Sequence, residues 1–283
     1  MSEAGLRDLF DRFRAAIEAD GARAATLLDA ALLVAMVGRS IDAETVEHTL
    51  EALAAGALAA VPTDGPLRPR LDGLCGFIAR GRGFGGDATR YYEAENSLLD
   101  RVLETGRGIP ITLAVVYAEV GRRLGLDCEG VNFPGHFLVR FRLGDEVLLV
   151  DPFDGRVLDD AACLELLRRT QGPTAVLREE HLQTATPLMV LVRMLNNLKQ
   201  LAVARERWRE ALRFSELILL AEPGLVLEHG ERAALYERLG EYELALVELQ
   251  LLDAVVDDEA LRARLAQEMT RIGGLGRAGR TLH

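Results

Sequence analysis

The sequence predicts an α+β fold, in which a helix packs on a small antiparallel sheet between two helical segments. Apolar residues recur at helical spacing over the first 60 residues. A strongly apolar helix follows later and is succeeded by alternation typical of strands, and helical patterns return after Leu158. We therefore expect an N-terminal helical segment, a central α+β domain and a C-terminal helical domain, with limits at 1–65, 66–186 and 187–283.

The N-terminal segment reads as three helices. The first has apolar residues at helical spacing, namely Leu6, Leu9, Phe10, Phe13 and Ile17. The stretch from Thr26 to Val37 is nearly all apolar and predicts a buried helix. Ser40 is the expected N-cap of the third helix, with Asp42 and Glu44 in its first turns. A turn-rich connection, residues 61–66, closes the segment.

A glycine-rich stretch follows a predicted helix at 71–80. It contains Gly81, Gly83, Gly85 and Gly86. Phosphate-binding loops of this composition follow a strand and continue into a Lys-Ser/Thr pair, and neither feature is predicted here. The sequence therefore indicates a loop and argues against a phosphate site.

The centre of the chain predicts the helix and sheet themselves. Asn96 and Ser97 precede a short helix as its expected N-terminal cap, and an apolar helix runs from Ile111 to Leu124. Three strands are predicted at 129–133, 136–143 and 146–150, with Gly144-Asp145 as a hairpin turn and Asp151-Pro152 at the end.

The C-terminal part contains an internal repeat. Three residue pairs are each separated by 34 positions: Leu201 and Leu235, Trp208 and Tyr242, and Ala211 and Ala245. This period, with a small residue where two helices meet, is typical of tetratricopeptide repeats. We expect repeats at about 192–225 and 226–259, the second weaker because Asp257 stands where Pro223 predicts proline, and a capping helix at 260–272.

Four short motifs in the central block carry a family resemblance. They are Asn96-Ser97-Leu98-Leu99-Asp100, Arg107-Gly108-Ile109-Pro110, Phe133-Pro134-Gly135-His136-Phe137 and Val150-Asp151-Pro152. This block resembles the transglutaminase-like superfamily, in particular the bacterial SirB-type proteins, which join such a domain to C-terminal tetratricopeptide repeats. The resemblance covers about residues 30–260. It implies a papain/transglutaminase-like core in which a Cys attacks an amide carbonyl, a His takes its proton and an Asp holds the His.

The functional residues of the family carry over unevenly. His136 and Asp151 match its His and Asp, and we expect these two side chains to meet. The family Cys belongs at the start of the core helix, where this chain has Pro110. The Gly-Ile-Pro-Ile pattern looks usual for the SirB-type branch, so the resemblance implies that Pro110 is a property of the branch. Thr112 is the nearest hydroxyl and the candidate replacement nucleophile.

Other polar residues beside this block leave two readings open. Asn96, Asp100, Arg107 and Pro110 are candidate binding residues near the expected cleft. Alternatively, Asn96 is a helix cap and Asp100 forms a surface ion pair with Arg107. The cysteines at 75 and 163 are expected to be buried, and Cys128 lies beyond the far end of the core helix. The five histidines show no metal-ligand spacing, so we expect neither a metal nor a cofactor.

Composition excludes several classes of function. The 283 residues carry a net charge of −11 with a pI near 5.1, which disfavours binding to nucleic acids or anionic membranes. No run of 18 apolar residues predicts a membrane span, and the N-terminus lacks the pattern of a signal peptide. Three cysteines, an odd number, are most simply reduced thiols, which indicates a cytoplasmic protein.

The missing thiol divides the functional hypotheses. The first is a non-catalytic module, or pseudoenzyme, that binds a protein or peptide or serves as a regulatory or scaffold subunit. The second is a divergent amide hydrolase or acyl transferase that uses His136 and Asp151 with Thr112 or water. The sequence favours the first and leaves open whether the protein is an enzyme.

Overall fold

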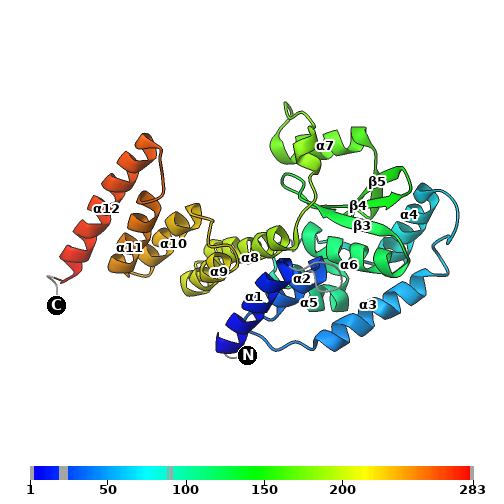
Figure 1. The fold of residues 1–283 in the computed structure, drawn as a ribbon, viewed down its shortest axis with the longest axis horizontal. Coiled ribbons are helices and arrows are strands. Elements are labelled where there is room, and N and C mark those ends of the chain that lie inside the picture. Colours follow the sequence, from blue (N-terminus) through cyan, green and yellow to red (C-terminus); the bar gives the residue numbers. More distant parts are fainter. Residues whose placement is uncertain (1–2, 19–24, 88, 90–91, 281–283) are drawn as a thin grey trace. The chain divides into compact units, whose positions relative to one another are not determined.

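The computed structural model describes residues 3–18, 25–87, 89 and 92–280, and it confirms a mixed fold of helices and small sheets (Figure 1). The chain divides into two compact units, with the boundary between Met194 and Leu195. We describe each unit separately.

The first unit begins with helices, continues through the sheet and ends within α8 (Pro187–Ala204). Its helices are α1 (Glu3–Ile17), α2 (Leu27–Ala35), α3 (Ala43–Ala57), α4 (Leu67–Cys75), α5 (Leu99–Thr105), α6 (Pro110–Arg123) and α7 (Asp160–Gln171). A π-helical turn, η2 (Gly76–Gly81), extends α4, and two 3₁₀ turns, η3 (Ala94–Ser97) and η4 (Glu179–Leu182), complete the set.

The sheet of this unit is antiparallel and has the order β3-β4-β5-β6. Its strands are β3 (Asp127–Val131), β4 (Leu138–Leu143), β5 (Glu146–Asp151) and β6 (Arg156–Leu158). The hairpin between β4 and β5 pairs Leu143 with Glu146, so the predicted two-residue turn at Gly144-Asp145 is confirmed. Two shorter strands, β1 (Gly85–Gly86) and β2 (Arg107–Gly108), pair in parallel, and β1 lies in the glycine-rich stretch predicted to be a loop.

Helix α6 is the core helix that the apolar pattern predicts. Every residue from Pro110 to Gly121 is buried. One side of the helix packs on β3 and β4, and the other packs on α2, α3 and α5. The far face of the sheet is covered by α7, through a cluster that includes Leu138, Leu158 and Leu166 (Figure 1). The sheet therefore lies between two helical layers.

Several predicted local features differ in the structure. Asp42, and not Ser40, caps α3, because its carboxylate accepts the Glu44 N–H. Asn96 and Ser97 form a 3₁₀ turn, and Leu98 precedes α5 without a side-chain cap. The first of the three predicted strands, β3, ends at Val131, and the next strand, β4, begins at Leu138. His136 therefore lies in the turn before the strand, where Gly135 adopts a φ of 66°.

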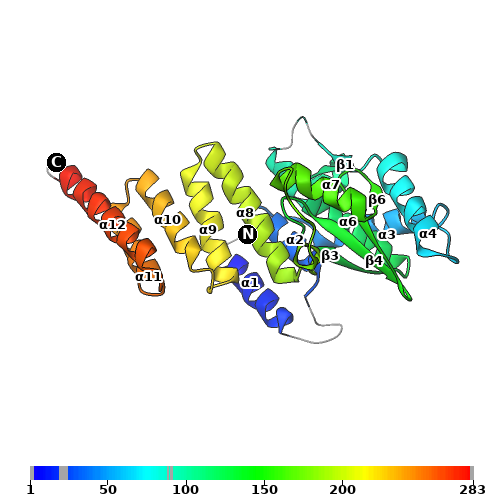
Figure 2. The ribbon, with the colours of Figure 1, turned by 90° about the horizontal axis from the view of Figure 1, so that it is seen from above.

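The second unit is helical. It contains the end of α8 (Pro187–Ala204) and α9 (Trp208–Ala221), α10 (Leu227–Arg238), α11 (Tyr242–Asp253) and α12 (Glu259–Arg280), with α9 to α12 packed successively (Figure 2). Ala211 and Ala245 are fully buried, and Trp208 and Tyr242 each begin a helix. None of the helices in the described ranges combines the length and apolarity needed to cross a membrane.

An ion-pair network ties β3 and β4 together at one end of the sheet. Glu129 accepts hydrogen bonds from Arg140, from Arg142 at 2.7 Å and from the Thr184 hydroxyl at 2.7 Å. Burial alone would raise the pKa of Glu129, but these three donors lower it to about 2. A carboxylate with a lowered pKa stabilises the fold above its unfolded pKa and loses that contribution as the pH falls.

Glu129→Gln is expected to lower the free energy of unfolding at pH 7 by about 2 kcal/mol, because two arginines lose their charged acceptor. The difference from the wild type should shrink as the pH falls from the ordinary pKa of 4.5 toward 2. Urea denaturation across this range measures it, with the exposed Glu51→Gln as control. A difference that is the same at pH 3 and pH 7 would contradict the assignment.

Candidate functional site

The structure brings His136 and Asp151 into direct contact. The His136 Nε2 and Asp151 Oδ1 atoms are 2.8 Å apart, and the two side chains are 8% and 0% exposed. His136 follows β3 in a turn closed by its own N–H, which donates to the Phe133 carbonyl at 3.0 Å. Asp151 is the last residue of β5. The two elements therefore place a base beside the carboxylate that can orient it.

Asp151 is held as a carboxylate. Burial alone would raise its pKa, but the hydrogen bond and charge of His136 and the Phe153 N–H, which donates to Oδ1 at 2.9 Å, bring the pKa below its usual value. Its other oxygen, Oδ2, is buried without a hydrogen-bond partner among the described residues. An ionised Asp151 fixes the orientation of the His136 ring.

Arg193 of α8 holds the turn that carries His136. One guanidinium nitrogen donates to the His136 carbonyl at 2.6 Å. The other donates to the Asn132 side chain and to the Phe133 carbonyl, the latter at 3.4 Å. The guanidinium also lies over the Phe137 ring, 5.5 Å from its centroid. Arg193 thus contacts the chain on both sides of the turn, at Asn132, Phe133, His136 and Phe137, and no sequence motif indicated this residue.

Phe153 packs against the pair and was also not identified from the sequence. Its ring meets His136 edge-on, with centroids 6.0 Å apart. Gly86 of β1 makes this possible, because a Cβ at that position would lie 2.1 Å from the Phe153 ring. Gly86 also donates its N–H to the Phe153 carbonyl at 3.0 Å. The glycine-rich stretch therefore serves as a packing surface beside His136.

The N-terminus of α6 presents no nucleophile at its first residue. Pro110 is the first helical residue, and its ring suits that position because the N–H it lacks would have no helical partner. The preceding Ile109 donates its N–H to the Asn96 carbonyl at 3.0 Å, which ties the helix start to η3. Proline offers neither a nucleophile nor a backbone N–H for an oxyanion.

Thr112 lies on a different side of α6 from Pro110. At about 100° per residue, Thr112 is about 200° around the helix from Pro110, whereas Gly121 is close to the Pro110 line. The Gly121 position faces the sheet, since a Cβ there would lie 2.5 Å from the Phe141 ring of β4. The Thr112 hydroxyl is therefore directed away from the sheet, and it is buried without a hydrogen-bond partner among the described residues.

The three cysteines are buried thiols. Burial raises the pKa of Cys75 and Cys128 to about 12 and that of Cys163 to about 11. Cys128 donates its Sγ hydrogen to the Ala118 carbonyl at 3.2 Å. The thiolate is the nucleophilic form of cysteine, so these side chains are unreactive at neutral pH.

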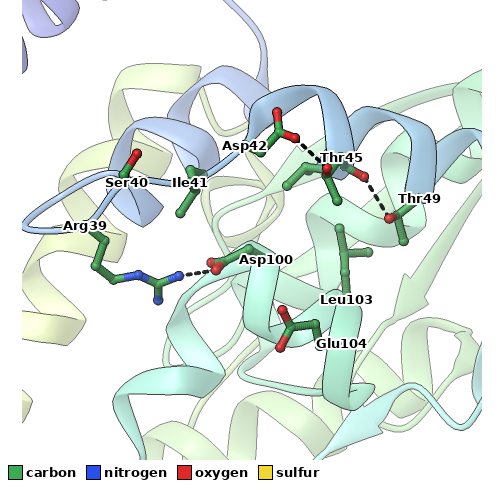
Figure 3. A pocket seen from close by; sticks show the side chains of 10 residues that line it. Arg39, Ser40, Ile41, Asp42, Thr45, Thr49, Asp100, Leu103 and Glu104 are labelled. Atoms are coloured by element: carbon green, nitrogen blue, oxygen red, sulfur yellow. Dashed lines mark hydrogen bonds and ion pairs between the residues drawn. The ribbon is translucent and has the colours of Figure 1, made fainter. Parts of the chain in front are cut away.

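The remaining predicted residues belong to η3, α5 and β2. Asn96 is buried in η3, and Arg107 is exposed in β2. Asp100 pairs with Arg39 of the loop before α3, so the predicted ion pair with Arg107 is wrong. Asp100 and Arg39 line a cavity formed by α3 and α5 (Figure 3).

Within the described ranges, no group of three or more His, Cys, Asp or Glu side chains is arranged to hold a metal ion. His136 instead bonds to protein groups: its carbonyl accepts from Arg193, and its Nε2 lies 2.8 Å from the Asp151 carboxylate. The arrangement can orient the His136 ring through Asp151.

Comparison with known proteins identifies similar sequences. A family model described as "Transglutaminase-like superfamily" matches residues 44–196. A UPF0162 protein of Xylella fastidiosa strain Temecula1 is 38% identical over 172 residues, which cover 59% of this chain and 61% of that protein. UPF0162 protein PA3419 of Pseudomonas aeruginosa is 35% identical over 188 residues, 66% of this chain and 69% of that one.

More distant matches extend the comparison. UPF0162 protein YchA of Escherichia coli K12 is 28% identical over 214 residues, covering 75% of this chain and 80% of the relative. A crystal structure of menin aligns with a TM-score of 0.42 and 12% identity over 88% of this chain and 69% of that chain, too low a similarity to support an argument. The alignment spans about three fifths of the Xylella relative's length.

Arg193→Ala is expected to loosen the turn that carries His136, because the His136 carbonyl and Asn132 lose their donor. The His136 amide should exchange its hydrogen at least about tenfold faster, as local opening becomes easier. Hydrogen exchange followed by NMR measures this, and Arg193→Lys should restore part of the protection. The exposed Arg209→Ala is the control. Unchanged exchange at His136 would show that Arg193 does not position the turn.

Native protein at pH 7 is expected to show no thiol reaction with Ellman's reagent over minutes, because all three cysteines are buried and protonated. After unfolding in guanidinium chloride, three thiols per chain should react. One thiol that reacts rapidly in the native protein would indicate an activated cysteine and reopen a catalytic assignment.

Proposed function

Because the chain belongs to the transglutaminase-like superfamily and has proline where that family's nucleophile is expected, we propose that it is a non-catalytic module that binds a protein or peptide. The single observation that carries the proposal is Pro110 at the first position of α6. Acyl transfer by this architecture needs an activated nucleophile at the start of that helix.

The rest of the site supports the same conclusion. The cysteines are buried with raised pKa values, and the Thr112 hydroxyl lies on the side of α6 away from the sheet. His136 and Asp151 could activate water, and without a preorganised donor for the oxyanion such a reaction is slow. What remains is a buried base and carboxylate, with Arg193 bonded to the His136 carbonyl and Phe153 packed against the His136 ring, an arrangement that stabilises the fold around the turn.

The helical unit supplies a second surface in this proposal. We assign it to tetratricopeptide-like repeats, and the protein to the SirB-type branch, because α9 and α11 begin 34 residues apart and bury equivalent alanines. The limits 1–65, 66–186 and 187–283 remain the proposed domain division. In this proposal the α+β domain and the helical repeats together bind a protein or peptide. The protein then has a regulatory or scaffold role in the cytoplasm.

A divergent amide hydrolase or acyl transferase is the second candidate. The observation that favours it is the 2.8 Å contact between His136 and Asp151, which is the geometry of a general base and its orienting carboxylate. Water or Thr112 would replace the thiol.

The two candidates differ in their response to His136→Ala. The partner is first captured with a photo-crosslinker and identified. Isothermal titration of this partner is then expected to give dissociation constants within about twofold for the wild type and His136→Ala, because binding does not need the base. Peptide, glutamine and isopeptide substrates should show no turnover above the His136→Ala background.

Turnover that His136→Ala abolishes would overturn the proposal. In that case Thr112→Val, which keeps the volume and removes only the hydroxyl, decides between the two nucleophiles. Loss of turnover in this variant would indicate Thr112, and retained turnover would indicate water.

A further inference from the structure

Two buried polar oxygens beside the loop between β5 and β6 have complementary chemistry. Tyr117 of α6 is fully buried, and its hydroxyl has no hydrogen-bond partner within the part of the chain that the structure describes. The same is true of Oδ2 of Asp151, the last residue of β5. A phenol hydroxyl can donate a hydrogen bond, and an ionised carboxylate oxygen can only accept one. Each group therefore lacks what the other can supply.

Both side chains lie at the same short loop. Asp151 pairs with Arg156 across β5 and β6, which closes the loop between them. The Asp151 carboxylate is turned over this loop, because its Oδ1 atom accepts the Phe153 N–H at 2.9 Å. Tyr117 reaches the loop at its last residue, since a Cβ on Gly155 would lie 3.1 Å from the Tyr117 hydroxyl oxygen. The two oxygens without partners therefore face one loop.

The position of Tyr117 on α6 explains why its hydroxyl reaches this loop. Tyr117 stands two turns after Pro110 and about 20° from the Pro110 line around the helix. That side of α6 faces the sheet, as the closeness of Gly121 to the Phe141 ring shows. Because α6 is buried from Pro110 to Gly121, the Tyr117 side chain cannot turn to solvent for a partner.

The charge states of the two groups suit a hydrogen bond from Tyr117 toward Asp151. Burial raises the pKa of Tyr117 above its usual value, and the proximity of Cys75 and Asp151 raises it further, partly offset by Arg80. Tyr117 is therefore a neutral hydroxyl whose hydrogen is available to donate. Asp151 is an ionised carboxylate, as its contacts with His136 and the loop require. A hydrogen bond to a buried carboxylate is stronger than one between neutral groups.

We propose that Tyr117 holds Asp151 through one buried water molecule, which accepts from the Tyr117 hydroxyl and donates to Asp151 Oδ2. The two oxygens are not in direct hydrogen-bond contact, and water is the smallest group that can accept from one and donate to the other. Tyr117 is then a positioning residue for the His136–Asp151 pair. With both carboxylate oxygens bound, Asp151 cannot rotate and Oδ1 stays on His136 Nε2. This role goes beyond the binding function above and does not depend on it.

Removal of the hydroxyl distinguishes a bonded group from one without a partner. Tyr117→Phe should raise the equilibrium constant for unfolding about fivefold, because Asp151 Oδ2 loses its donor. A buried hydroxyl without a partner is itself unfavourable, so in that case the variant would be as stable as the wild type or more stable. Urea denaturation of the full-length protein measures the difference, and this second result would overturn the proposal.

The ring proton of His136 reports whether the effect passes through Asp151. Since Asp151 is ionised, His136 Nε2 carries the hydrogen shared with Oδ1, and its NMR signal depends on the strength of that bond. Loss of the donor at Oδ2 makes Oδ1 a stronger acceptor, so Tyr117→Phe should shift this signal downfield. A variant that only loosened the loop would shift it upfield, which contradicts a positioning role. Tyr236→Phe, at a half-buried tyrosine of α10, should leave the signal unchanged.

A high-resolution crystal structure of the wild-type protein tests the water itself and needs no variant. Density for a water molecule is expected at about 2.7–3.2 Å from both the Tyr117 hydroxyl and Asp151 Oδ2. A direct bond between the two oxygens, another partner for either of them, or no water between them would overturn the proposal. These measurements involve neither a partner nor turnover, so their failure leaves the test with His136→Ala unaffected.

Discussion

The complete burial of α6 is the constraint on which the first unit depends. The helix is covered by β3 and β4 on one side and by α2, α3 and α5 on the other, so each of its residues from Pro110 to Gly121 is fixed by packing. Gly121 illustrates how close the contact is, since any side chain there would strike Phe141. Because the packed helix cannot rotate or slide, its contacts along the whole length determine where its first residue, Pro110, lies.

That register explains why the site retains a base and an orienting carboxylate without a nucleophile. Pro110 initiates the helix well, since it needs no N–H at that position, but it also removes the thiol and the backbone donor that acyl transfer uses. His136 and Asp151 are held from the opposite side by the turn before β4 and the end of β5. Their hydrogen bond is a rigid structural feature, and chemistry at it depends on a group that α6 does not supply.

Arginine–carboxylate pairs organise the polar parts of both units. Glu119, Glu129 and Glu248 each bind two cationic side chains, and in each case burial or partial burial strengthens the interaction. Other buried carboxylates have one cationic partner, as in the pairs of Asp151 with His136 and of Glu228 with Lys199. The partly buried Asp100 pairs with Arg39 beside the cavity between α3 and α5.

Much of the local structure could be predicted because it depends on neighbours in sequence. Pro110 and Gly125 mark the limits of α6, with Gly125 at a φ of 75°, and Gly144-Asp145 forms the hairpin. Caps were less predictable, because Ser40 and Asp42 are both competent and only the path of the chain into α3 selects Asp42. The start of β4 was misplaced because Phe137 and Leu138 are buried regardless of whether the backbone is a strand.

By itself, the sequence determined the mixed fold, the apolar core helix with Pro110 at its start, the spacing of His136 and Asp151, and the 34-residue period of the C-terminal helices. Each follows from periodicity or backbone chemistry over short distances. Only the tertiary structure decided that Arg39 is the partner of Asp100, that Arg193 anchors the His136 turn, and that Gly86 admits Phe153 beside His136. These contacts join residues about 60 positions apart, and the packing of whole elements, which no local pattern encodes, brings them together.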